Sequence, residues 1–360
     1  MMNTIKGLCL PLTLSTLAAC SGGGNSNNGI QIDNREPLNL SFTEAPIELP
    51  GISADYAEDV PYGDKERNLF DIYLPDCDEP TPLVIFIHGG GFTGGDKSSA
   101  AGSGDVIREF LQSCVAYAAI NYTLLVVPSN EEGTGSIVAQ GGVLTSLRDP
   151  ARALQFMRYH FASLNLNPEM VATYGGSAGA GAGLWLGTHD DMADPENEDP
   201  VLRESTRVKA VGALNTQSTY DIPGWESVLL PFTQQFADLL GGTDVVTLAS
   251  AVGATNYLLT FLGVDTLEGI YSPENVAYRA NIDMLGLMDS SDAPIYVENY
   301  ETGLDDLLNL FLHHGLHALA IKARADEVGL ESVGYVRDPA YPLEDPSGEG
   351  MTSFLLRHIN

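Results

Sequence analysis

The feature that most constrains this chain is the pentapeptide Gly-Gly-Ser-Ala-Gly at residues 175–179. It follows the apolar run 170–174, which is typical of a strand, and it precedes a small-residue stretch from Ala178 that is typical of a helix. A sharp strand-to-helix turn needs small residues because backbones crowd there, and it raises a serine hydroxyl above the sheet edge. The helix N-terminus also favours negative charge. Ser177 is therefore a candidate nucleophile; the alternative is a glycine-rich turn that serves close packing alone.

A second glycine-rich segment, His-Gly-Gly-Gly-Phe at residues 88–92, directly follows the apolar run 82–87. Glycines at such a place let backbone N–H groups approach a substrate oxyanion. Together with the N–H of Ala178, they would form an oxyanion hole beside Ser177. Two such motifs, each at the end of a strand, argue against the packing-only alternative.

The rest of the chain predicts a doubly wound, mostly parallel sheet, because strands alternate with helices. Strands are expected at 68–74, 82–88, 115–122, 170–174, 208–214, 294–299 and 333–337, and helices at 149–162, from 178, at 316–328 and at 353–358. The helix at 149–162 should carry Pro150 at its first position. The apolar, helical stretch at about 223–292 interrupts this alternation. We interpret it as a cap inserted above the active-site face; the alternative is a helical excursion packed on the sheet.

On these two motifs the chain resembles the α/β-hydrolase carboxylesterases and the hormone-sensitive-lipase-like esterases, over roughly residues 61–360. The resemblance implies an α/β-hydrolase fold, a small-molecule ester substrate and no cofactor. It also implies that the second and third glycines, Gly90 and Gly91, donate to the oxyanion. His88 is then structural and holds the loop.

The position of the general base departs from the family pattern. This family places a histidine after its last strand, but the loop at 338–348 contains none. Four other histidines are excluded by their expected places in the fold: His88, His160, His189 and His358. His314 or His313 is the expected base, from a loop on the active-site face. His317 lies one turn into a helix and is expected to pack. The alternative is that His313 and His314 only precede or cap that helix.

The acid that orients the base has several candidates. Glu301, Asp305 and Asp306 follow the strand at 294–299, where the family places its acid, and Asp306 represents them here. Asp221 follows the strand at 208–214, and some family members carry the acid one strand inward. For each candidate the alternative is a solvated acid, since the chain has 48 acidic residues.

The N-terminus predicts an exported lipoprotein. Lys6 precedes an apolar run at 7–19 that is too short to span a bilayer, and the run ends in Leu-Ala-Ala-Cys at Cys20, which resembles a bacterial lipobox. We expect a signal peptide at 1–19, a lipidated Cys20, a flexible tether at 20–40 and the hydrolase domain at 41–360. Ser21 after the cysteine favours the outer membrane in such lipoproteins. The alternative is an ordinary cleaved signal.

The net charge argues against some partners, and the spacing of the possible ligand residues argues against a metal ion. The net charge of −31 repels nucleic acid and anionic membrane surfaces. The histidine and aspartates at 189–194 match no zinc or calcium spacing. We interpret this segment as an acidic loop at a helix end and expect no metal.

Cys77 and Cys114 are expected to form a disulfide. Each precedes a strand, and in the order implied by the resemblance these strands are parallel neighbours whose starting ends lie side by side. Neighbouring strands lie about 4.8 Å apart, within reach of a disulfide. The alternative is two independent buried thiols.

The function expected from these residues is hydrolysis of carboxylic esters through an acyl-enzyme on Ser177. One alternative is a degraded hydrolase that binds a ligand or partner at the membrane surface, supported by the missing histidine. Another alternative is a peptidase of the same fold. The absence of a propeller-sized domain before the core argues against this alternative.

Overall fold

The computed structural model describes residues 35–360 except 130–136, 235–236, 238–241 and 301–306. The strands are β1 (Phe42–Thr43), β2 (Ala54–Pro61), β3 (Leu69–Pro75), β4 (Thr81–Ile87), β5 (Ala116–Ile120), β6 (Leu166–Gly176), β7 (Ala210–Leu214), β8 (Ile295–Asn299), β9 (Ser332–Val336) and β10 (Leu343–Glu344). The α-helices are α1 (Gly104–Gln112), α2 (Leu144–Tyr159), α3 (Ala178–Thr188), α4 (Trp225–Thr233), α6 (Val245–Ala251), α7 (Thr255–Leu262), α8 (Pro273–Asn281), α9 (Met284–Leu287), α10 (Leu307–His313), α11 (Gly315–Val328) and α12 (Met351–Ile359).

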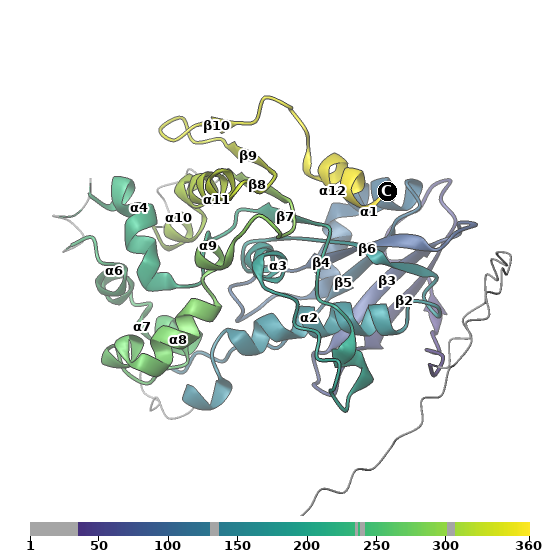
Figure 1. Ribbon diagram of the computed structural model, residues 1–360, viewed down its shortest axis with the longest axis horizontal. Helices are drawn as coiled ribbons and strands as arrows, with labels where there is room; N and C mark the ends of the chain where they lie inside the picture. Colours follow the sequence, from purple (N-terminus) through teal and green to yellow (C-terminus); the bar gives the residue numbers. More distant parts are fainter. Residues whose placement is uncertain (1–34, 130–136, 235–236, 238–241, 301–306) are drawn as a thin grey trace, which may run out of the picture. The chain divides into compact units, whose positions relative to one another are not determined.

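The strands form a single mixed sheet in the order β1-β2-β3-β5-β4-β6-β7-β8-β9-β10 (Figure 1). From β5 to β9 the neighbours in this order are all parallel, and the strands outside that block pair antiparallel. Parallel strands end at the same edge, so the carboxyl ends of β4, β6, β7 and β8 lie together. The predicted mostly parallel, doubly wound sheet is confirmed.

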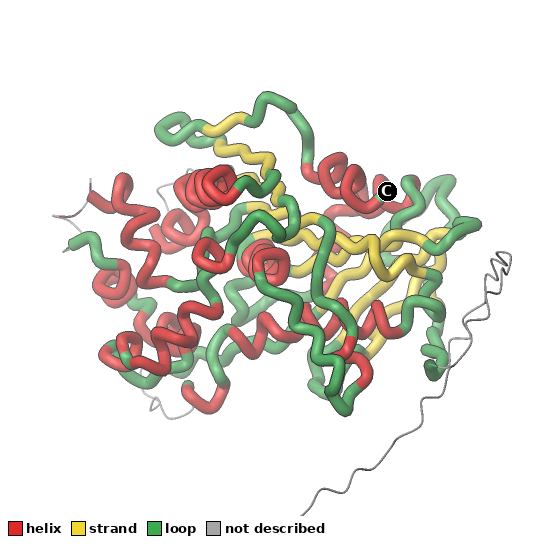
Figure 2. Tube along the Cα trace, in the orientation of Figure 1, coloured by secondary structure: helices red, strands yellow, loops and turns green. Residues whose placement is uncertain are grey.

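Helices cover both faces of the sheet, which Figure 2 shows as strands enclosed between helices. α1 and α12 pack on one face, where the aromatic rings of Tyr117, Tyr174 and Phe354 are buried. α2, α3 and α11 pack on the other face, where Trp185 and Ile321 are buried. The central strands are buried on both sides, which explains their nearly continuous apolar sequences.

Helices α4, α6, α7, α8 and α9 all lie between β7 and β8 in the chain, within the stretch expected as an insertion. In Figure 1, α4, α6, α7 and α8 group at one end of the domain, whereas α9 lies beside α3. They contact the core directly: the N–H of Val143 donates to the Phe261 carbonyl at 2.9 Å. The Tyr278 hydroxyl accepts from the N–H of Leu144 at 3.1 Å.

These contacts explain one wrong prediction, the start of α2. The sequence placed Pro150 at the first helical position, whereas α2 begins at Leu144 and holds Pro150 inside it. A proline inside a helix removes one backbone hydrogen bond and is normally unfavourable. Here the added N-terminal turn is held by the insertion helices through Phe261 and Tyr278, a tertiary effect that local sequence does not reveal.

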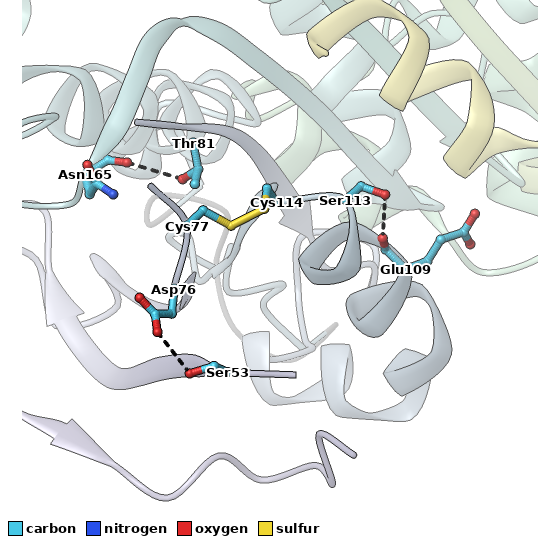
Figure 3. The surroundings of a disulfide bond; sticks show 8 residues. All are labelled: Ser53, Asp76, Cys77, Thr81, Glu109, Ser113, Cys114 and Asn165. Carbon is cyan, nitrogen blue, oxygen red and sulfur yellow. Dashed lines mark hydrogen bonds between the residues drawn. A yellow bond between two sulfur atoms is a disulfide. The ribbon is translucent and has the colours of Figure 1, made fainter. Parts of the chain in front are cut away.

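The structure joins Cys77, in the loop before β4, to Cys114, in the turn before β5 (Figure 3). Their Cα atoms are 6.2 Å apart. The loop of Cys77 folds back toward the sheet and is held by neighbours on both sides. Thr81 donates its N–H to the Asn165 carbonyl at 2.9 Å, and Ser53 donates its hydroxyl to Asp76 at 3.4 Å.

The expected signal peptide, Cys20 and the first part of the tether fall on residues 1–34, outside the described residues. Within the described ranges, no helix is long and apolar enough to cross a membrane.

Candidate active site

Ser177 occupies a strained turn between β6 and α3. Its backbone has φ 53° and ψ −124°, a region that non-glycine residues rarely adopt and that often marks a functional site. The turn lies tightly against β4: a Cβ added to Gly175 or Gly179 would lie 2.4 or 2.0 Å from the Ile87 carbonyl oxygen. These glycines therefore allow the close approach that the turn requires, and Ser177 is left half-buried at the sheet edge.

The histidine that faces this serine is His313, the last residue of α10. Its Nε2 lies 2.8 Å from Ser177 Oγ. Its Nδ1 lies 2.8 Å from Asn309 Oδ1, one turn earlier on the same helix. An amide oxygen only accepts, so Nδ1 carries the proton and Nε2 offers a lone pair to the serine hydroxyl. This is the arrangement of a nucleophile with a general base and an orienting group.

His314, the other expected base, does not face the serine. The chain breaks between α10 and α11 at this residue, and the break turns the His314 ring into the core. There its Nδ1 accepts from the Leu316 N–H at 3.1 Å, capping α11, and the ring packs against Phe232 and Tyr341. Burial lowers the pKa of His314. His314 therefore has the capping role that the sequence offered as the alternative.

His317 is fully buried and structural. Its Nδ1 accepts from the Ser218 N–H at 3.2 Å, and its Nε2 donates to the Phe311 carbonyl at 3.0 Å. Burial lowers the pKa of His317 to about 3, so the ring is neutral at physiological pH. It links the loop after β7 to α10, the helix that carries His313.

Asp221 must be corrected as a candidate for the orienting acid. Its carboxylate faces Arg279 of α8, with 2.6 Å between Arg279 Nε and Asp221 Oδ1. The chain leaves β7 toward the insertion here, and Asp221 fixes that departure rather than the histidine. The other acidic candidates, Glu301, Asp305 and Asp306, lie outside the described residues. Within the described part, Asn309 is the side chain on His313 Nδ1.

Asn299, at the end of β8, contributes to the site although no sequence motif predicted it. It is only 1% exposed. Its Oδ1 accepts from the Thr216 N–H at 3.0 Å, and its Nδ2 lies 3.1 Å from the His313 carbonyl and 3.2 Å from the His314 carbonyl. Asn299 thus ties the end of α10 to the exit of β7 and fixes the backbone of His313. The sequence signal that could have indicated this role is a polar amide side chain at the end of an apolar strand.

The oxyanion-hole candidates separate into two groups. Gly91 and Ala178 line the pocket that contains Ser177, and Gly90 does not. Ala178 is the first residue of α3, so no carbonyl within the helix accepts its N–H. Gly90 shapes the turn: its φ is +115°, and a Cβ there would lie 2.2 Å from the Gly94 carbonyl oxygen. The backbone of Gly91 and Ala178 therefore borders the pocket beside Ser177.

His88 holds the glycine loop in place, the role that the resemblance implied. Its Nδ1 lies 2.7 Å from the Gly89 carbonyl, and Arg67 approaches its Nε2 at 3.4 Å. The ring stacks on Tyr122, with centroids 4.3 Å apart, and Tyr122 donates to the His88 carbonyl at 2.9 Å. Burial lowers the pKa of His88, so a neutral ring donates from Nδ1.

Two further tyrosines support the oxyanion side and were not anticipated. The Tyr220 hydroxyl donates to the Ala178 carbonyl at 2.8 Å, and the Tyr257 hydroxyl donates to the Gly91 carbonyl at 2.9 Å. Burial raises the pKa of both, so each remains a protonated donor at physiological pH. Tyr257 belongs to α7, so the insertion supplies part of the site.

No metal site accompanies this geometry in the part of the chain that is described: no cluster of three or more His, Cys, Asp or Glu side chains could hold an ion there. In the acidic segment after α3, Asp191 accepts from the N–H groups of Ala193 and Thr206 at 3.1 and 2.8 Å. His189 packs its ring against Trp185.

Comparison with curated proteins gives partial matches. A probable isoprenylcysteine alpha-carbonyl methylesterase of Arabidopsis thaliana is 25% identical over 157 residues, covering 43% of this chain and 29% of that protein. Lipase 1 of Geotrichum candidum is 30% identical over 105 residues, covering 29% of this chain and 18% of that protein. The chain thus spans less than a third of the length of these relatives.

Comparison with solved structures shows the fold. A truncated carbohydrate esterase from gut microbiota matches with a TM-score of 0.56 at 14% identity, covering 89% of this chain and 98% of that one. A bifunctional GH43-CE protein of Bacteroides eggerthii matches with a TM-score of 0.55 at 18% identity, covering 85% and 38%. The fold is that of the α/β-hydrolase esterases, as the sequence predicted. The family model described as BD-FAE matches residues 70–257, more than half of the sequence, so this chain belongs to the BD-FAE family.

Proposed function

We propose that this chain hydrolyses carboxylic esters through an acyl-enzyme on Ser177. The observation that carries the proposal is the 2.8 Å contact between His313 Nε2 and Ser177 Oγ on a strained strand-to-helix turn. Relatives named as a methylesterase, a lipase and a gut esterase are consistent with it. The loop after the last strand contains no histidine, and the contact with His313 supports the enzyme over the degraded-hydrolase alternative because it offers Ser177 a base from another segment.

The geometry supports a two-step reaction. His313 takes the hydroxyl proton of Ser177 as the oxygen attacks the ester carbonyl, and the negative charge that forms is held by the N–H groups of Gly91 and Ala178. Protonated His313 then returns the proton to the departing alcohol, which leaves an acyl-serine. A water molecule, deprotonated by the same histidine, attacks the acyl carbon and frees the acid and Ser177.

Asn309 is proposed as the group that orients His313. An amide fixes the ring tautomer but adds no charge to stabilise the imidazolium, so a weaker effect than that of a carboxylate is expected. Asp306 stays a proposed carboxylate partner, because it precedes α10 directly. The two assignments predict opposite effects of mutating Asn309 and Asp306 on kcat.

Hydrolysis of nitrophenyl acetate by the purified domain tests the proposal. The wild type should release nitrophenol above the background rate, and Ser177→Ala should lower kcat by about 10⁴-fold or more while leaving the melting temperature unchanged. Equal rates for the two proteins would contradict an acyl-enzyme on Ser177.

We further propose that Cys20 is lipidated after removal of residues 1–19, and that residues 20–40 tether the hydrolase domain to the cell envelope, at the outer membrane. The strongly acidic domain would not adhere to anionic lipid by itself, so a covalent anchor is the physical means of attachment. Expressed in a bacterium, the full chain should enter the detergent phase, and Cys20→Ser should move it to the aqueous phase. Equal partitioning of both forms would contradict the anchor.

A further inference from the structure

An apolar chamber lies beside the serine pocket, between the insertion and α10. Its walls are aliphatic and aromatic side chains of α6, α7, α10 and the segment after β7, and its cavity volume is about 50 Å³. Leu248, Leu258 and Phe311 line it, and all of them are buried. The serine pocket itself has a cavity of about 20 Å³, room for about one water molecule.

The chamber and the serine pocket share a wall. Ile222, Trp225, Tyr257 and Leu312 line both spaces. The two spaces are therefore adjacent, and a group at Ser177 that is larger than the small serine pocket would pass these side chains to enter the chamber. At its other end the chamber meets solvent, because Val252 and Leu308 also line it and are 38% and 43% exposed.

The polar side-chain atoms on the shared wall already donate hydrogen bonds within the protein. The Trp225 indole N–H donates to the Thr219 carbonyl at 2.7 Å, and the Tyr257 hydroxyl donates to the Gly91 carbonyl at 2.9 Å. Both rings thus offer carbon surface to the chamber. A sugar placed there would leave its hydroxyl groups without partners, which is unfavourable for each one buried. An aliphatic chain has no such groups and gains free energy from burial.

We propose that this chamber binds an aliphatic chain of the ester substrate. The protein would then be an esterase for apolar esters rather than for acetylated sugars. The inference rests on the proposed ester hydrolysis at Ser177. The chain could belong to the acyl group or to the alcohol, and the chemistry of recognition is the same for both. Each methylene that enters the chamber should raise kcat/KM by about fourfold, the effect of roughly 0.8 kcal/mol per buried CH₂.

Two substrate series test the proposal: nitrophenyl acetate, butyrate, hexanoate and octanoate vary the acyl chain, and methyl, butyl and hexyl acetate vary the alcohol. The wild type should prefer the longer chains in one of the series, and that series identifies the occupant. Ala249→Phe, which fills the chamber from α6, should lower the ratio of hexanoate to acetate kcat/KM, or the equivalent alcohol ratio, at least tenfold. Val252→Trp at the exposed mouth should act in the same direction without disturbing buried packing.

Ala251→Phe is the matched control, because Ala251 is exposed on the same helix and does not line the chamber. It should keep the wild-type ratio. Acetate hydrolysis that depends on Ser177, with no chain-length preference in either series or with ratios unchanged in both filling variants, would overturn the chamber assignment and leave the proposed function standing. Absence of Ser177-dependent hydrolysis for every ester would overturn both.

Discussion

The two halves of the candidate site are built in different ways. The nucleophile half consists of backbone turns at the ends of β4 and β6, and its geometry depends on glycines next to Ser177. The base half is assembled from separate segments, the exit of β7, the end of β8 and α10, which are joined by the side chain of Asn299. A catalytic turn can thus be encoded in a few consecutive residues, whereas a histidine can be placed by contacts that no short motif records.

The largest effect should come from removing the base. His313→Ala is expected to lower kcat on nitrophenyl acetate by about 10⁴-fold or more, because the serine hydroxyl loses its proton acceptor. His314→Asn is the matched control on the adjacent residue; asparagine also caps helices well, so α11 should be retained and kcat should fall less than about tenfold. A larger loss in His314→Asn than in His313→Ala would reverse the assignment.

An intermediate effect should follow from Asn299, which positions the base without touching substrate. Asn299→Asp keeps the acceptor for Thr216 but loses the donor to the His313 carbonyl. A displaced base should lower kcat by roughly 10- to 100-fold with little change in KM, since small misplacements are costly in catalysis. The melting temperature of each variant separates this from unfolding. An unchanged kcat in a folded Asn299→Asp protein would show that the clamp does not position His313.

The smallest effect on kcat is expected from mutating Asn309. The same experiment decides whether Asn309 or Asp306 contacts His313 Nδ1. If Asn309 orients the ring, Asn309→Ala should lower kcat by about tenfold and Asp306→Asn should change it less than about twofold. If Asp306 is the partner, the order reverses and Asp306→Asn costs on the order of 10³-fold or more. Asn309→Asp adds a sharper readout: a carboxylate beside the ring favours its protonated form, so the acid limb of the pH–kcat profile should move to higher pH.

The difference between the halves also explains what the sequence predicted. The strands β3 to β9, the parallel sheet and the turn at Ser177 follow from hydrophobic patterning and local glycines, which act over a few residues, whereas the edge strands β1, β2 and β10 were not predicted. The choice between His313 and His314 depends on the break between α10 and α11, which a run of leucines and histidines does not reveal. Asn309 was accessible in principle, because residues four apart on a helix share a face, but α10 was not expected.

Contacts with the insertion also could not be predicted from local sequence. Tyr257 reaches Gly91 from α7, and Phe261 and Tyr278 hold the first turn of α2. Each contact joins residues more than 100 positions apart in the chain. Hydrophobic patterning predicted that an apolar helical segment lies there but not which of its side chains meet the active-site loops.

The most direct measurement of the central claim, that His313 activates Ser177, is the rate of phosphonylation by a fluorophosphonate followed by intact mass. The wild type should gain one phosphonyl group, and peptide mapping should place it on Ser177. The labelling rate should fall by at least about 10³-fold in His313→Ala and remain near the wild-type value in His314→Asn. Labelling of His313→Ala at the wild-type rate, or a label on any residue other than Ser177, would contradict the account.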